Sequence, residues 1–210
     1  MSDLQLAALT SHPIQYQAPL FREINSREGI DLTVYFCSKQ GVEPHVDEGF
    51  GQEVVWDVPL LEGYNYEFLP DRSPLGEADS FFRFNPGIVR ALQDGDHDVL
   101  WVHGYESLTN VSAILAANHY DVPVVFRGEV MPDTVQGSLK RTIISWLFNY
   151  IDAFASIGTP NRRVYESFGV PDDRIYHAPY SVHNEFFQRQ REQLPPIPEL
   201  REKEGIPINN

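Results

Sequence analysis

One cysteine, Cys37, is all that the 210-residue sequence contains. A single thiol excludes an internal disulfide, and a chain without disulfides fits a reducing compartment. Because Cys37 lies inside an apolar run, we expect a small buried core side chain rather than a reactive thiol.

Long hydrophobic runs are also missing. No stretch reaches the roughly 18 apolar residues that span a bilayer, and the N-terminus carries Asp3 where a signal peptide has basic residues. Hydrophobic residues nevertheless make up 42% of the chain, which indicates a folded core rather than disorder. We therefore expect a globular cytoplasmic protein.

Basic residues are scarce. The chain has 16 Lys and Arg against 30 Asp and Glu, which gives a net charge of −14. Nucleic-acid binding needs a basic surface that neutralises phosphates, so nucleic acid is not an expected partner. An acidic surface suits both ordinary solubility and a salt-rich cytoplasm, and the sequence does not separate the two.

Several cofactor and metal motifs are absent. No Gly-x-Gly-x-x-Gly follows the first expected strand, and neither a phosphate-binding loop ending in Gly-Lys-Ser/Thr nor a Gly-x-Ser-x-Gly elbow occurs. Residues 94–98 begin like a calcium loop, but Val99 and Tyr105 stand where that loop needs glycine and glutamate. The histidines lack the close spacing of zinc ligands. We expect neither a cofactor nor a metal.

Short apolar strands alternate with helical stretches along most of the chain. This alternation predicts βαβ crossovers, and continuous apolar runs predict a parallel sheet covered on both faces. The expected strands are 4–10, 31–37, 54–56, 64–69, 99–103, 124–127, 153–157 and 175–178, and the expected helices are 18–26, 85–93, 107–119, 137–150 and 159–168. Asn85 is expected to cap its helix. The predicted fold class is a doubly wound, mostly parallel, Rossmann-like α/β fold in three αβα layers.

The composition changes after Phe187. Residues 188–210 are charged and hold four prolines, which is typical of a linker that leads out of a domain. We therefore expect one domain over residues 1–187, followed by a linker toward a domain that the sequence does not include.

Polar residues follow the expected strand ends, which is where ligands bind in an open parallel sheet. The candidate site residues are His12, Gln15, His103, Arg127, Gly128, Glu129 and Tyr180.

Four of these candidates have a purely structural alternative. His12 can hold its own loop, and His103 can be a satisfied core histidine. Arg127 can bind an anionic acceptor or a phosphate, or it can pair with Glu129 or Glu106. Glu129 can steer an acceptor hydroxyl or form that same ion pair.

The segment 140–151 also has two interpretations. Basic residues beside Trp146 are compatible with a peripheral membrane contact. A helix that is apolar on most sides is more often buried against the sheet, and two cations are weak against such an acidic surface. We expect burial.

Three segments resemble a known family. Residues 11–22 resemble the opening of a subgroup of the family 4 glycosyltransferases, and residues 98–104 resemble their fourth-strand segment, which ends in a histidine. Residues 179–187 resemble the stretch that closes their N-terminal domain. The likeness covers nearly the whole chain to Phe187. It implies a GT-B architecture, in which two Rossmann-like domains face each other across a cleft.

The resemblance also implies a function. The chain would be the N-terminal, acceptor-side half of a retaining, metal-independent glycosyltransferase that passes a sugar from a nucleotide-sugar donor to a hydroxyl acceptor. His103 would be the catalytic residue that contacts the transferred sugar, and the absent C-terminal domain would hold most of the donor.

Two positions depart from the family pattern. Residues 11–13 replace the glycines that let backbone amides approach the donor phosphates, and His183 replaces an aspartate. A GT-B epimerase or phosphorylase half stays open, as does a stand-alone binding subunit whose donor domain is another chain.

Overall fold

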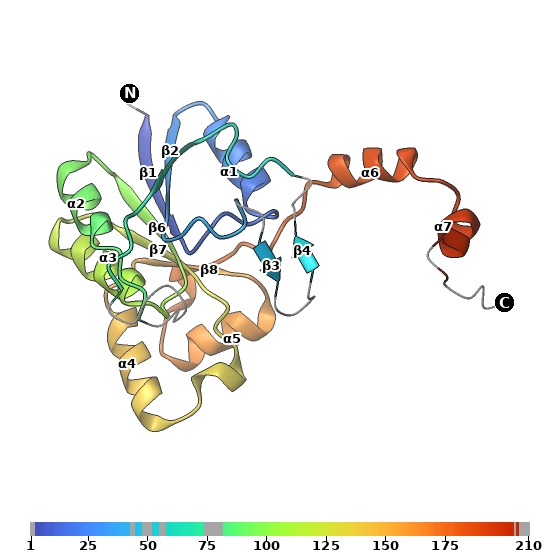
Figure 1. The fold of residues 1–210 in the computed structure, drawn as a ribbon. Coiled ribbons are helices and arrows are strands. Elements are labelled where there is room, and N and C mark those ends of the chain that lie inside the picture. The colour runs from blue at the N-terminus through green and yellow to red at the C-terminus, as the bar shows by residue number, and fades with distance from the viewer. Residues whose placement is uncertain are drawn as a thin grey trace. The chain divides into compact units, whose positions relative to one another are not determined.

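Seven parallel strands form the main sheet of the computed structural model, which describes residues 3–42, 45–47, 52–54, 58–73, 82–203 and 205. The strands are β1 Leu4–Thr10, β2 Ile30–Phe36, β5 Asn65–Phe68, β6 Val99–His103, β7 Val124–Arg127, β8 Ala153–Ser156 and β9 Ile175–His177. Their order is β5-β2-β1-β6-β7-β8-β9, and every neighbouring pair is parallel. Figure 1 labels β2, β1, β6, β7 and β8 of this sheet. The predicted parallel sheet is confirmed.

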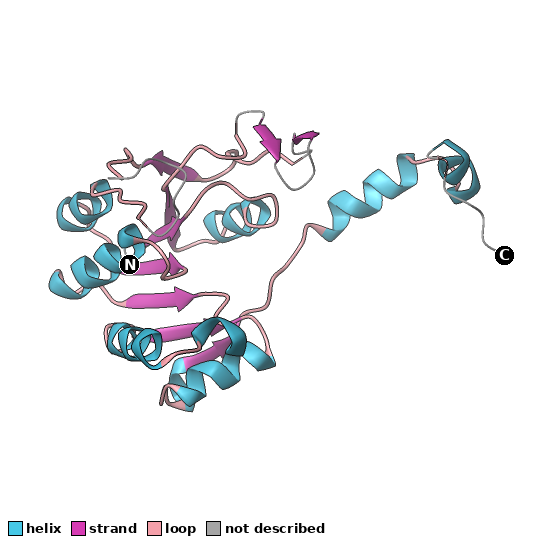
Figure 2. Ribbon diagram, turned by 60° about the horizontal axis from the view of Figure 1, so that its bottom comes forward, coloured by secondary structure: helices cyan, strands magenta, loops and turns pink. Residues whose placement is uncertain are grey.

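Helices cover both faces of this sheet (Figure 2). The helices of this part of the chain are α1 Ala18–Asn25, α2 Gly87–Asp94, α3 Leu108–His119, α4 Ser138–Phe148 and α5 Thr159–Ser167. The chain moves one way across the sheet from β1 to β2 and the other way from β6 to β9. Since such crossovers are right-handed, α1 lies on one face and α2 to α5 lie on the other.

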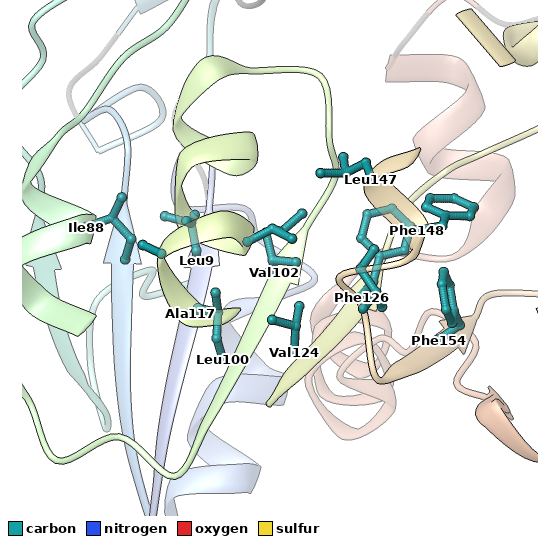
Figure 3. Close-up of a cluster of buried hydrophobic side chains, with 14 of the residues drawn as sticks. Leu9, Ile88, Leu100, Val102, Ala117, Val124, Phe126, Leu147, Phe148 and Phe154 are labelled. Atoms are coloured by element: carbon teal, nitrogen blue, oxygen red, sulfur yellow. The ribbon is translucent and has the colours of Figure 1, made fainter. Parts of the chain in front are cut away.

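Successive side chains of the central strands point to opposite faces of the sheet and pack into two separate hydrophobic cores. The larger core lies between the sheet and α2 to α5, and Figure 3 shows Leu100, Val102, Val124 and Phe126 within it. The smaller core lies beneath α1 and includes Trp101, the residue between Leu100 and Val102. Burying one such side chain contributes roughly 1.5–3 kcal/mol, so both faces stabilise the sheet.

Cys37 follows β2 and is 2% exposed, as its apolar surroundings predicted. Burial raises the pKa of its thiol to about 12, because the charged thiolate is poorly solvated there.

Asn85 does not cap α2, contrary to expectation. Pro86 occupies the N-cap position, and no side chain caps the helix. The Asn85 side chain is fully buried, and its Nδ2 donates to the carbonyls of Cys37 at 3.0 Å and Leu69 at 2.9 Å. These carbonyls lie just beyond the ends of β2 and β5, where they need buried donors. The amide therefore links two strand ends instead of capping a helix.

Helix α4 is buried on one side only. Ile144 and Leu147 face the larger core, whereas Leu139, Ile143 and Trp146 are 73%, 55% and 45% exposed. The expected burial of this segment therefore holds for its sheet-facing side. No helix in the described part of the chain is long and apolar enough to cross a membrane.

Two further parts of the chain are described separately. The strand expected at 54–56 lies partly outside the described residues, and β4 Gln52–Val54 pairs antiparallel with β3 His45–Asp47 rather than with the main sheet. The chain divides into compact units at Tyr180 and Ser181, and the second unit carries α6 Asn184–Gln193 and α7 Ile197–Lys203. The expected domain end at residue 187 stays a prediction.

Candidate functional site

A cavity of about 390 Å³ opens at the carboxyl ends of β1, β6 and β7. The chain leaves β1 and β6 toward opposite edges of the sheet, so these two neighbours form its topological switch point. Ligands of doubly wound proteins bind at such points, because crossovers to opposite faces leave a crevice between them. The lining includes Thr10, Gln17, His103, Arg127, Glu129 and Tyr180.

The sheet register brings the two central candidates together. His103 on β6 and Arg127 on β7 are direct partners in the parallel ladder, and the amide of Gly104 donates to the Arg127 carbonyl at 2.8 Å. Gly104 has a φ of +85°, which glycine adopts without strain. The chain can therefore turn sharply after His103, which leaves this histidine at the cavity edge.

The start of α3 holds the same turn. Asn110 donates from Nδ2 to the carbonyls of His103 at 2.8 Å and Gly104 at 3.0 Å. The Ser107 hydroxyl caps the helix by accepting a hydrogen bond from the backbone N–H of Asn110. The backbone that follows the His103 side chain is therefore fixed by hydrogen bonds.

A buried hydrogen-bond chain sets the proton position of His103. Thr10 Oγ1 donates to Gln17 Oε1 at 3.1 Å, and Gln17 Nε2 lies 3.1 Å from His103 Nδ1. An amide nitrogen only donates, so Nδ1 accepts and the ring proton is on Nε2. The Nε2 atom is shielded from solvent and has no partner among the described residues. The ring therefore presents one unused donor.

His103 is neutral at physiological pH. Burial, together with the neighbouring Arg127 cation, lowers the pKa of its imidazole to about 3. The ring packs against Trp101 with centroids 4.3 Å apart. His103 can therefore donate a hydrogen bond to a ligand without carrying a charge.

Arg127 is 3% exposed, and no carboxylate lies within ion-pairing distance of it among the described residues. Its Nη2 donates to the Pro179 carbonyl at 3.2 Å, and its guanidinium lies 4.5 Å from the Tyr180 ring centroid. The ion pair with Glu129 or Glu106 that the sequence allowed is not formed. Burial lowers the pKa of the guanidinium, although an arginine stays protonated in proteins.

The loop after β7 is held rigidly. A Cβ at Gly128 would lie 2.5 Å from Cζ of Phe126, so only glycine fits there. The Gly128 carbonyl accepts from Asn161 Nδ2 at 3.0 Å and from the Tyr165 hydroxyl at 3.1 Å. These bonds position the next residue, Glu129, at the cavity.

Glu129 is exposed and accepts a hydrogen bond from the Tyr180 hydroxyl. Burial raises the pKa of Tyr180, and the hydrogen bond to the Glu129 carboxylate raises it further. Tyr16 packs edge-on against Tyr180 with centroids 5.1 Å apart. The carboxylate and the two tyrosines form one wall of the cavity.

The two candidates that follow β1 differ in position. His12 lines the cavity, and its Nδ1 lies 2.9 Å from the Ser11 hydroxyl. Gln15 is not among the lining residues, whereas Gln17 is, and Gln17 is 4% exposed. Sequence reasoning missed Gln17. A polar side chain beside the apolar start of a helix was the available signal.

The described residues contain no group of three His, Cys, Asp or Glu side chains that could hold a metal ion. What the cavity offers is a neutral imidazole donor, a buried cation, an accessible carboxylate and aromatic walls. Such a set is suited to bind and orient a polar ligand with hydroxyl and anionic groups.

No family model matches the chain, and no curated protein matches it in sequence. Solved structures match it in fold. The Anabaena protein Alr3699/HepE in complex with UDP-glucose is 12% identical, with a TM-score of 0.61 over 96% of this chain and 50% of that one. UDP-N-acetylglucosamine 2-epimerase from Rickettsia bellii is 10% identical, with a TM-score of 0.59 over 98% of this chain and 52% of that one.

A third match is the UDP-GlcNAc 2-epimerase from Neisseria meningitidis bound to UDP-GlcNAc, at 15% identity and a TM-score of 0.50 over 90% of this chain and 53% of that one. The chain thus spans about half the length of these structures. At such low identity the likeness shows the fold alone. The chain has the three-layer, Rossmann-like fold of a GT-B domain.

Proposed function

We propose that the chain is the N-terminal, acceptor-side half of a retaining glycosyltransferase that uses a nucleotide-sugar donor. The observation that carries the proposal is the unpartnered Nε2–H of neutral His103 at the switch-point cavity. The GT-B likeness supports it, because matched structures hold UDP-glucose or UDP-GlcNAc. The segments that resemble family 4 glycosyltransferases support it as well.

His103 would orient the transferred sugar. As the nucleotide leaves, positive charge builds on the sugar ring, and a charged imidazolium nearby would oppose it. A neutral ring that donates from Nε2 to a sugar hydroxyl fixes the reactive pose and adds no second cation beside Arg127, and such positioning can remove several kcal/mol from the barrier. The depressed pKa of His103 is therefore compatible with this role.

Glu129 and Tyr180 would serve the acceptor side. The carboxylate of Glu129 is exposed and keeps lone pairs beyond the one that Tyr180 occupies. It can accept a hydrogen bond from an incoming hydroxyl group. His12, Gly128 and the aromatic wall would shape the rest of the acceptor pocket.

A second candidate is the N-terminal half of a nucleotide-sugar 2-epimerase. The observation in its favour is that several of the matched structures are UDP-GlcNAc 2-epimerases. Inversion at carbon 2 breaks a C–H bond, so an epimerase brings solvent hydrogen into the sugar. Glycosyl transfer leaves that hydrogen in place.

The deciding experiment uses the full-length protein encoded with this chain. It is incubated in D₂O with UDP-glucose or UDP-GlcNAc and a panel of hydroxyl acceptors, and the products are analysed by mass spectrometry. We expect a glycosylated acceptor without deuterium in the sugar. Deuterium at carbon 2 with no acceptor product would replace the proposal by the epimerase, and a coding sequence without any donor domain would favour a separate binding subunit.

A further inference from the structure

Arg127 is a buried cation, and no carboxylate of a described residue pairs with it. Its side chain is 3% exposed, yet the ion pairs formed by described residues all involve other arginines on the surface. Arg162, for comparison, pairs with Glu166 and Asp172 while remaining partly exposed. Burying an unpaired ion costs several kcal/mol of folding free energy. A residue that only supports the fold would therefore destabilise the protein at this position.

The groups around Arg127 leave its donors largely unused. One nitrogen, Nη2, reaches the Pro179 carbonyl, while Nε is shielded and has no hydrogen-bond partner among the described residues. The rings of Tyr180 and Trp101 lie 4.5 and 5.9 Å from the guanidinium carbon, and they offset part of the desolvation. The nearest acidic side chain along the chain, Glu129, is engaged by the Tyr180 hydroxyl.

A second unused donor lies on the partner strand. His103 is the direct register partner of Arg127, and its Nε2–H is shielded and unpartnered. Both residues line the same cavity. One fixed cation and one fixed neutral donor at neighbouring strand ends match an oxyanion, which accepts hydrogen bonds and supplies negative charge.

We propose that Arg127, assisted by His103, forms an oxyanion-binding subsite for a phosphate or carboxylate group of the ligand. The oxyanion comes either from the diphosphate of a nucleotide or from an acidic acceptor. A planar guanidinium that already lies over the Tyr180 ring loses little freedom on binding. The subsite extends the proposed function, but it is defined by charge and can be tested without any transfer reaction.

The test is calorimetric titration of the protein with sodium phosphate, sodium acetate, UDP and uridine. We expect at least one of the anions to bind in the millimolar range or tighter, and Arg127→Gln to weaken that binding tenfold or more, about 1.4 kcal/mol. UDP binding without uridine binding assigns the subsite to a nucleotide phosphate, and acetate binding assigns it to an acidic acceptor. Equal anion affinity in the protein and in Arg127→Gln overturns the proposal, as does a protein that binds none of these anions.

Arg141→Gln is the matched control. Arg141 also stacks on a ring, with its guanidinium carbon 4.4 Å from the Phe168 centroid, but it does not line this cavity. Its loss should leave anion binding unchanged, and a comparable loss in this variant would mean that general charge attracts the anion.

Nuclear magnetic resonance of the unmodified protein covers the case in which Arg127→Gln does not fold. The Nε–H signal of Arg127 should shift on titration with the anion that binds, and an unmoved signal contradicts the subsite. If anions bind at Arg127 but the protein transfers no sugar, the subsite stands and the proposed function is wrong. If sugar transfer occurs and Arg127→Gln does not affect it, the proposed function stands and the subsite is wrong.

Discussion

Gln17 at the start of α1 donates to Nδ1 of His103 at the end of β6, across 3.1 Å in space and 86 positions in the sequence. The same amide accepts from Thr10, so three elements of the switch point share one hydrogen-bond chain. Because the amide donates, His103 keeps its proton on Nε2, which has no partner among the described residues. Gln17 is therefore a positioning residue for His103.

Replacing Gln17 by Glu tests this relationship. A carboxylate accepts rather than donates, so the variant should move the ring proton to Nδ1 and raise the pKa of His103. We expect the full-length enzyme to lose about tenfold in turnover, or ~1.4 kcal/mol, with a small change in KM. Nitrogen-15 spectra of the ring report the tautomer directly, and an unchanged Nε2–H form would contradict the positioning role.

His103→Ala removes the proposed sugar contact itself. Turnover of the full-length enzyme should fall about a hundredfold, or ~2.7 kcal/mol, while the melting temperature changes little. A purely structural histidine predicts the opposite pair of results, because its loss lowers stability and leaves each folded molecule active. Measuring both quantities on one preparation separates the two roles.

The depressed pKa of His103 makes stability depend on pH. The native imidazole titrates near 3 and the unfolded one near 6.5, so below 6.5 the unfolded state binds the extra proton. This contribution is absent above pH 6.5 and destabilises the fold as pH falls toward 3, by at most about 1.4 kcal/mol per pH unit. As the pH is lowered, the urea midpoint of unfolding should fall less steeply in His103→Gln than in the unmodified protein. Parallel midpoint curves for the two proteins would show that the native ring is not shielded.

Gly128→Ala tests the rigidity of the loop that carries Glu129. The added Cβ would lie 2.5 Å from Cζ of Phe126, a fully buried ring in the larger core. Such overpacking costs about 1–3 kcal/mol. Gly169→Ala is a useful comparison, because its Cβ meets no atom within 4 Å and its penalty comes from a positive φ alone. Chemical denaturation measures both, and an unchanged Gly128→Ala midpoint would mean that Phe126 moves easily.

The chain by itself should bind sugar nucleotides weakly and transfer no sugar. In the proposed GT-B arrangement most donor contacts belong to the other domain, so only part of the binding energy is available here. Calorimetry with UDP-glucose and GDP-mannose should give dissociation constants weaker than ~10 μM. Tighter binding would mean that this half holds the donor unaided.

Local sequence determined the strands of the sheet and the residues at their ends. Continuous apolar runs placed β1, β6 and β7 at residues 4–10, 99–103 and 124–127, with the observed bounds. An apolar strand must be covered on both faces, so the parallel arrangement followed from composition. Since parallel strands end at one edge, the proximity of His103 and Arg127 was predictable as well.

Only the tertiary structure decided the contacts that depend on side-chain direction and on distant partners. The local sequence predicts that Asn85 caps a helix. In the folded chain its side-chain amide instead donates to two carbonyls at the ends of β2 and β5. Gln15 and Gln17 both precede α1, and only the folded chain shows that Gln17 is the one that lines the cavity and contacts His103. Glu129 is close to Arg127 in sequence, yet its carboxylate accepts a hydrogen bond from Tyr180, and no described carboxylate pairs with the guanidinium. Hydrophobic periodicity specifies elements because burial is a property of each segment, whereas a hydrogen bond or an ion pair is a property of two positions that only the packed chain brings together.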